Sequence, residues 1–182
     1  MLFPWTAYDD RDKKEREMGL SEDLEMVALQ ERELRLQRLD AQTAWDLGVR
    51  LRSMAVDRGL AVVIDVRRFG QPLFYTALEG TTPDNVEWVR RKSNLVARLH
   101  RSSYAVGLNL KLKNDTLVER YGMPLTDYAA HGGAFPLAVA GAGVVGSVTV
   151  SGLPQRADHE LVIEALCAML QCDYAALRLA AE

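Results

Sequence analysis

The chain has 182 residues, 48% of them apolar, which is enough to bury a sizeable core in one domain. Its 22 Lys and Arg residues against 25 Asp and Glu residues give a net charge of −3, which excludes a general attraction to phosphate backbones or anionic lipid. No window reaches the ~20 apolar residues of a membrane span, and the first 20 residues lack the apolar centre of a signal peptide. We therefore predict a cytoplasmic protein whose partners include neither nucleic acid nor a membrane.

The cysteines and histidines predict no metal site. Cys167 and Cys172 are five residues apart in a helical pattern, so their side chains point apart and cannot form a disulfide. We expect free thiols, as in a reducing compartment. The three histidines are scattered and have no ligand spacing that would build a closed coordination shell.

The first 40 residues divide into two predicted parts. Residues 1–20 are mixed in charge and show no period, so we predict a disordered extension there and a single domain over residues 21–182. From Ser21, a favourable N-cap, the apolar spacing predicts a charged amphipathic helix that ends near Asp40.

A second helix is predicted from Asp40 to a C-cap at Gly59. Its apolar stripe consists of small and medium side chains that permit close approach of another element: Ala41, Ala44, Gly48, Leu51 and Ala55. Residues 61–69 and 72–78 then read as two strands of a hairpin, with Gly70-Gln71 as a type II′ turn. Asp65 and Arg67 share one face of the first strand and are predicted to form an ion pair.

Thr82-Pro83 predicts the start of the next helix. We expect its inward face to carry Trp88, Val89, Val96 and Leu99, and its other face to be basic through Arg90, Arg91, Lys92, Arg98 and Arg101. Residues 102–128 are less distinct and predict a short strand or helix with a turn at Tyr121-Gly122.

A second hairpin is predicted from the strands 134–139 and 144–151, connected across Ala140 to Gly143, and Pro154 opens a last helix that runs to about Arg178. Two hairpins require antiparallel pairing, whereas a doubly wound fold would alternate single strands with helices. The predicted fold class is therefore α+β, with a central antiparallel sheet flanked by helices.

Four segments together resemble a known family: IDVRRFGQPLF, GTTPDNVEWVRRKSNLV, DYAAHGGAFPLAV and GVVGSVTVSGLPQRADHELV. The chain resembles the haem-degrading domain family, with its HbpS-like and GlcG-like relatives, over about residues 21–178, and most of all its uncharacterised branch. The resemblance implies a profilin-like α/β sandwich, a soluble homo-oligomer, and binding of haem or a related small molecule.

The candidate site lies where two glycine corners precede and follow the second hairpin. His131 stands before Gly132-Gly133, where the backbone can approach a ligand, and its imidazole can bind haem iron or transfer protons near neutral pH. The Ser151-Gly152 corner leads to Asp158 and His159 in the first turns of the last helix. Each of these residues also has a structural explanation, since His131 can stabilise the turn, Asp158 can interact with the helix dipole and His159 can be solvated.

In the leading hypothesis, the protein binds haem or a related carboxylated planar ligand, with His131 or His159 as axial ligand. Arg90 or Arg91 would pair with the propionates, although such charge runs are more often solvated. The alternative is a non-enzymatic oligomeric scaffold or partner-binding protein in which the charged helices make subunit contacts. No nucleophile with a partnered base appears, so catalysis is not predicted from the residues.

Overall fold

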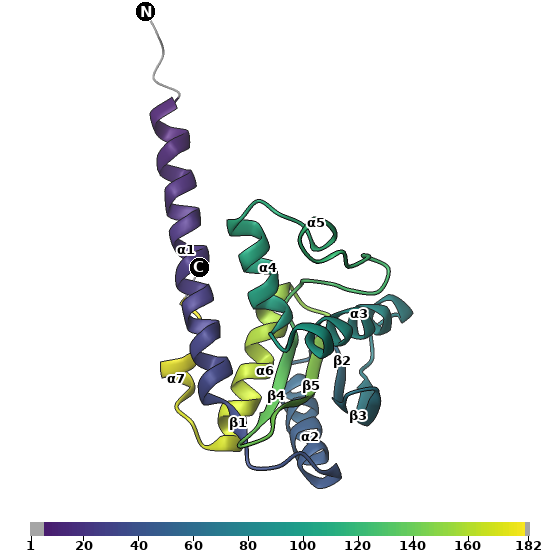
Figure 1. Ribbon diagram of the computed structural model, residues 1–182. Helices are drawn as coiled ribbons and strands as arrows, with labels where there is room; N and C mark the ends of the chain where they lie inside the picture. Colours follow the sequence, from purple (N-terminus) through teal and green to yellow (C-terminus); the bar gives the residue numbers. More distant parts are fainter. Residues whose placement is uncertain (1–5, 181–182) are drawn as a thin grey trace, which may run out of the picture.

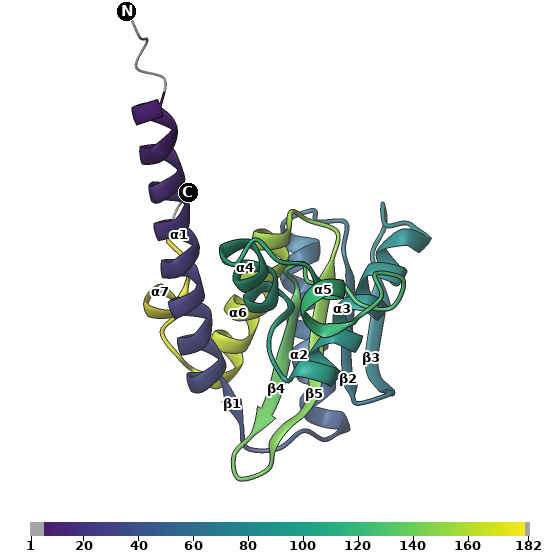
Figure 2. The same cartoon turned by 45° about the horizontal axis from the view of Figure 1, so that its top comes forward.

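The computed structural model describes residues 6–180 and contains one five-stranded sheet with helices on both faces (Figures 1 and 2). The strand order is β1-β4-β5-β2-β3. The strands are β1 (Arg35–Leu36), β2 (Val63–Arg68), β3 (Gln71–Ala77), β4 (Ala134–Val139) and β5 (Gly143–Ser151). This architecture confirms the α+β class. The central strands pair antiparallel as predicted, and the two-residue β1, which was not predicted, adds a parallel edge beside β4.

The two faces of the sheet differ in chemistry. Helices α2 (Ala41–Asp57) and α6 (Gln155–Leu170) cover one face, where Ile64, Val148 and Val150 belong to the main apolar core. Helix α3 (Pro83–Leu99) covers the other face, where β5 presents polar side chains. The hydroxyl groups of Ser93 on α3 and Thr149 on β5 lie 2.9 Å apart there. The polar face is the one that carries the site.

Helix α1 (Thr6–Glu33) is much longer than predicted. The structure places residues 6–20 in the same helix as residues 21–33, where a disordered extension was expected, and residues 1–5 lie outside the described residues. Strong helix formers without Pro dominate this segment, so a helix fixed by packing farther along can propagate through it. Its first half projects beyond the body of the molecule (Figure 1).

The end of α1 also differs from the prediction. The helix ends at Glu33 rather than near Asp40, and the chain then reaches the sheet edge as β1. Leu34, Leu36 and Leu39 all enter the core on the way. An extended segment that buries alternate leucines was indistinguishable, by apolar spacing alone, from the last turns of a helix.

The predicted N-cap of helix α2 and its close approach to the sheet are both confirmed. The Asp40 carboxylate accepts a hydrogen bond from the Thr43 backbone N–H at 2.8 Å. At Gly48 the helix lies so close to β3 that an added Cβ would stand 2.2 Å from the Phe74 ring. Small side chains on this stripe therefore allow helix and sheet to touch.

Both predicted hairpins are present. In the first, Arg68 pairs with Gln71, so the turn residues are Phe69 and Gly70, and Gly70 (φ +74°) takes the second central position rather than the first. The type II′ turn was therefore misplaced by one residue. The Asp65–Arg67 ion pair is confirmed, with Arg67 Nη2 donating to Asp65 Oδ1 at 3.0 Å.

The indistinct middle of the chain is helical, with α4 (Ser103–Leu112) and α5 (Leu117–Tyr121), the latter ended by Gly122. The last predicted helix is two: α6 stops at Gln171, which has a left-handed backbone (φ 58°), and α7 (Tyr174–Leu177) is capped by Asp173. Cys172 thus lies beyond α6, and both cysteines are free thiols. None of the described helices is long and apolar enough to span a membrane.

Candidate ligand-binding site

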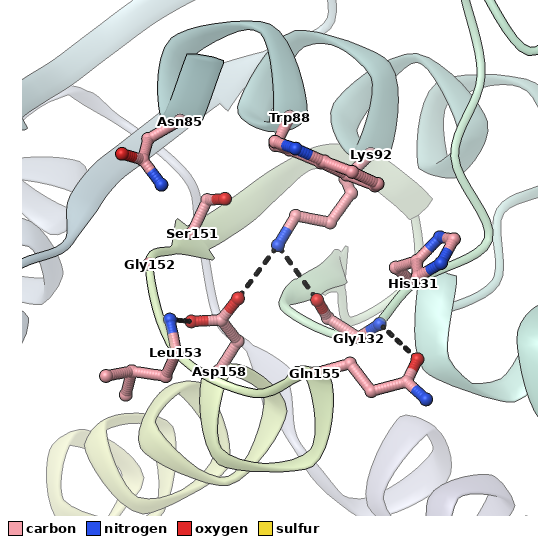
Figure 3. A pocket seen from close by; sticks show the side chains of 10 residues that line it. All are labelled: Asn85, Trp88, Lys92, His131, Gly132, Ser151, Gly152, Leu153, Gln155 and Asp158. Carbon is pink, nitrogen blue, oxygen red and sulfur yellow. Dashed lines mark hydrogen bonds and ion pairs between the residues drawn. The ribbon is translucent and has the colours of Figure 1, made fainter. Parts of the chain in front are cut away.

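The glycine corners predicted from the sequence converge in space on one polar pocket of about 210 Å³ (Figure 3). We call it the polar pocket. The start of α3, the end of β5 and the first turn of α6 form its walls, and the loop before β4 closes it. Its lining residues are Asn85, Trp88, Lys92, His131, Gly132, Ser151, Gly152, Leu153, Gln155 and Asp158.

Lys92 forms the inner wall of the polar pocket and is 2% exposed. Its ammonium group donates to the carbonyl oxygens of Gly132 (2.8 Å) and Val150 (2.7 Å) and to Asp158 Oδ2 (3.1 Å). Burial lowers the pKa of Lys92, but three acceptors around Nζ match the three protons of an ammonium. The side chain thus joins α3, β5, the His131 corner and α6 as a charged cross-link.

Asp158 lies in the first turn of α6, as the sequence predicted, and its side chain is buried. It is 3% exposed, and its second oxygen accepts the Leu153 backbone N–H at 2.9 Å. Burial raises the pKa of its carboxyl group, while Lys92 and the Leu153 N–H oppose that rise. Both carboxylate oxygens are therefore engaged.

The glycines of the His131 corner permit this crowding. A Cβ at Gly132 would stand 2.0 Å from the Gln155 carbonyl oxygen. Gly133 has φ +119°, and a Cβ there would stand 2.6 Å from Lys92 Nζ. The predicted close approach of the backbone is thus real, but its neighbours are the protein's own lysine and helix.

His131 is exposed and lies on the rim of the polar pocket. Its ring stands edge-on to Trp88, with centroids 5.0 Å apart, and no hydrogen bond holds its side chain among the described residues. Partial burial and the nearby cations Lys92 and Arg91 lower its pKa, which favours the neutral imidazole at pH 7. A neutral, accessible imidazole is the form that binds metal.

A second hollow, of about 700 Å³, adjoins the polar pocket and shares Trp88, His131 and Gln155 with it. We call it the apolar groove. Leu110, Leu117, Leu125 and Tyr128 contribute its apolar walls, and the cations at its edge are Arg91 and Lys111. This volume is in the range of ordinary small-molecule sites, whereas the polar pocket is smaller.

His159 does not line the pocket with His131. It is fully buried under Tyr104 and Phe135, and its Nε2 lies 2.8 Å from Gln30 Oε1. The Gln30 amide nitrogen donates to the Leu177 carbonyl, so its oxygen accepts and the histidine proton sits on Nε2. Burial lowers the pKa of His159 to about 3. The expectation of a solvated or pocket-facing imidazole was wrong here.

The candidate residues Arg90 and Arg91 also lie in different surroundings. Arg90 points away from both hollows and bonds to Glu87, Asp127 and the Thr126 carbonyl oxygen. Arg91 donates to the Leu125 carbonyl and stacks over Trp88, 4.1 Å from the ring centroid. Of the pair, Arg91 alone reaches the apolar groove.

Several residues of the site were not predicted from the sequence, among them Lys111 and Gln155, and the predicted position of Lys92 was wrong. Lys92 was placed on the basic face of α3, although it follows Val89 by three positions and precedes Val96 by four, the spacing of a shared inward face. That spacing was the available signal. Nothing in the sequence marked Lys111 or Gln155.

Among the described residues, no group of three or more His, Cys, Asp or Glu side chains is arranged to hold a metal ion. His131 is the accessible imidazole that lines both hollows.

The family model of the haem degrading protein HbpS-like family matches residues 39–167. The chain belongs to this family. Curated relatives carry the name UPF0303 protein: the one from Paraburkholderia phymatum is 61% identical and that from Acidobacterium capsulatum 60% identical. These matches cover 90% and 89% of this chain and 99% and 98% of the relatives.

Several solved structures share the fold of this chain. The Ybr137w protein is 28% identical with a TM-score of 0.75, over 81% of this chain and 87% of that one. HbpS is 20% identical with a TM-score of 0.57, over 75% and 92% of the two chains. A PduOC complex with haem is 14% identical with a TM-score of 0.62, over 71% and 94%. The last two similarities establish the fold only.

Proposed function

We propose that this protein binds haem, or a related planar carboxylated ligand, in the apolar groove with His131 as the axial ligand. The observation that carries the proposal is an accessible imidazole, favoured in its neutral form, on the rim of a groove with apolar walls. Two comparisons support the proposal: this chain belongs to the HbpS-like family, and a protein with a similar fold has been solved as a haem complex.

The residues of the groove suit the parts of such a ligand. Leu110, Leu117 and Tyr128 can pack on the macrocycle, while Lys111 and Arg91 can pair with its carboxylates. His159 is unsuited to the axial role because reaching it would require opening the core around Gln30. Haem, when bound, supplies the iron chemistry, and the side chains of this protein bind and orient it.

The test is a haemin titration followed by visible absorption on the wild type, His131→Ala and His100→Asn. His100 is an exposed histidine at the end of α3 whose left-handed backbone (φ 54°) asparagine tolerates, so it controls for nonspecific imidazole binding. We expect a saturable Soret shift in the wild type and in His100→Asn and its loss in His131→Ala. Equal titrations of all three proteins would overturn the proposal.

Lys111→Met tests the carboxylate contact independently of the iron. We expect weaker haemin binding with the same Soret maximum, because the axial ligand stays in place. Lys113→Met is the matched control, since Lys113 is exposed on the same helix end and outside the groove. If both variants bind like the wild type, Lys111 has no role in carboxylate recognition.

A second candidate function, the oligomeric scaffold, is favoured by one observation. Trp45, Val49 and Val56 form an exposed apolar stripe on α2, with 57%, 41% and 52% of their surfaces exposed. Exposed apolar patches often contact another chain. Sedimentation of wild type and Trp45→Glu tests it: a smaller assembly in the variant supports the scaffold, and identical monomers in both exclude this stripe as an interface.

A further inference from the structure

We propose that the polar pocket is a second binding site, distinct from the apolar groove, for a small carboxylate of three or four carbons. The hydrogen-bonding groups of the pocket favour such a ligand. The acceptors that line the pocket are used internally, since Asp158 receives Lys92 and the Leu153 N–H, and the Gly132 carbonyl receives Lys92.

The unused polar groups are mainly donors. The Asn85 oxygen accepts from Thr82, which leaves the amide nitrogen to the pocket. The Gln155 oxygen accepts the Gly132 N–H at 3.3 Å and is therefore also used internally. A site whose free polar groups are mainly donors favours an acceptor-rich ligand such as a carboxylate.

Ser151 is the most specific of these donors. It is 4% exposed, its hydroxyl group points toward the centre of the pocket (Figure 3), and no partner holds that hydroxyl among the described residues. Because Ser151 lines the pocket, an oxygen atom of a ligand can accept the hydrogen bond of this hydroxyl group in place of water.

Electrostatics favour an anion at the same place. Helix α6 begins at Gln155, so the positive end of a 16-residue helix adjoins the pocket. The Lys92 ammonium lies in the wall, and the charge of Asp158 is already balanced by that ammonium and by the Leu153 N–H. Because the Lys92–Asp158 pair is neutral overall, the N-terminus of α6 is the net contribution that favours an anion in the pocket.

The volume sets the size of the ligand. About seven waters fill 210 Å³ at roughly 30 Å³ each, so a molecule of about five to seven non-hydrogen atoms fits and a macrocycle does not. With so few atoms, affinity in the millimolar range is expected. The flat ring of Trp88 and the ring of His131 close the outer side.

The experiment is an NMR titration of the full chain with propionate and, as an isosteric neutral control, propionamide. We expect saturable binding of propionate and at least a tenfold weaker effect of propionamide, because the amide lacks the charge and replaces an acceptor by a donor. Propionate that fails to bind, or propionamide that binds equally well, would overturn the proposal.

Ser151→Ala locates the site, with Ser147→Ala as its control. Ser147 is a buried serine four residues earlier on the same face of β5 and does not line the pocket. We expect Ser151→Ala to weaken propionate binding about fivefold to tenfold, the value of one hydrogen bond, and Ser147→Ala to leave it unchanged. Equal behaviour of the two variants would overturn the assignment.

The haemin titration separates this proposal from the previous one. Ser151 lies outside the apolar groove, so Ser151→Ala should leave haemin binding unchanged while propionate binding falls. Loss of haemin binding in Ser151→Ala would mean that the two hollows act as one site, which contradicts a separate carboxylate site.

Discussion

At the scale of single residues, Lys92 has the largest consequence for stability. Its ammonium donates to two carbonyl oxygens and balances the charge of the buried Asp158 carboxylate. Removing one partner of a buried ion pair leaves an uncompensated charge, which costs more than the pair contributes. Lys92 is therefore the residue on which the geometry of the polar pocket depends.

We expect Lys92→Met to lower the free energy of unfolding by about 3–5 kcal/mol, as measured by urea denaturation. The double variant Lys92→Met/Asp158→Asn should recover part of that loss, because the stranded carboxylate is gone. Arg98→Met, at an exposed position of the same helix, should stay within roughly 0.5 kcal/mol of the wild type. A similar, small effect of Lys92→Met would show that Asp158 is satisfied without it.

His159 makes the fold sensitive to acid. Its pKa is about 3 in the folded protein and 6.5 in an unfolded chain, so the unfolded state binds the proton first. The contribution of His159 is complete above pH 6.5 and is lost as the pH falls toward 3. Below pH 6.5, this residue should remove about 1.4 kcal/mol of stability per pH unit.

The prediction is tested by urea unfolding of wild type and His159→Leu between pH 7.5 and 5. The variant should be less stable at pH 7.5, because Gln30 loses its partner, but its stability should fall less steeply with acid. Parallel pH profiles of the two proteins would show that another group governs the acid response.

At the scale of elements, glycines decide how closely helices approach their neighbours. Gly48 brings α2 against the Phe74 ring of β3, and that ring also meets Trp45 edge-on at 5.8 Å. The ring has little room to move aside, so a side chain at position 48 would push the helix from the sheet.

Gly48→Ala should therefore destabilise the protein by about 1–3 kcal/mol through overpacking, although alanine favours a helix. Gly19→Ala is the matched control, because Gly19 also lies in a helix and nothing stands within 4 Å of its added Cβ. It should be neutral or stabilise by up to about 1 kcal/mol. Thermal denaturation distinguishes the two, and a stabilised Gly48→Ala would contradict the tight contact.

Sequence patterns predicted the elements unevenly, for identifiable reasons. The capped helices α2 and α3 and both hairpins follow local rules, since caps and glycine turns act within a few residues. The end of α1 and the end of α6 do not, because each is fixed by contacts distant in sequence. Leu34 and Leu36 leave the helical path to join the core, and residue 171 stops α6 with a left-handed backbone that glutamine rarely adopts.

At the scale of the whole molecule, ligand binding and global stability are linked. A ligand that binds the folded state alone stabilises it by about 2.7 kcal/mol when present at 100 times its Kd. For a chain of this size, that corresponds to a rise in Tm of roughly 5–10 °C.

We expect haemin to raise the Tm of the wild type by this amount and to have little effect on His131→Ala, as followed by circular dichroism at fixed protein concentration. Propionate should still raise the Tm of His131→Ala, although by less than that of the wild type, because His131 also lines the polar pocket. A haemin effect of equal size in His131→Ala would argue against axial ligation by that residue.

The sequence alone determined the fold class, both hairpins, the family resemblance and the segments that meet at the site, because all of these are carried by local patterns of apolar residues, glycine and caps. The tertiary structure decided the roles of the polar residues. It buried Lys92, Asp158 and His159, turned Arg90 outward, and exposed His131 between two hollows. Whether a polar side chain meets water, a partner or a cavity depends on elements far away in the chain, and no spacing along one segment encodes it.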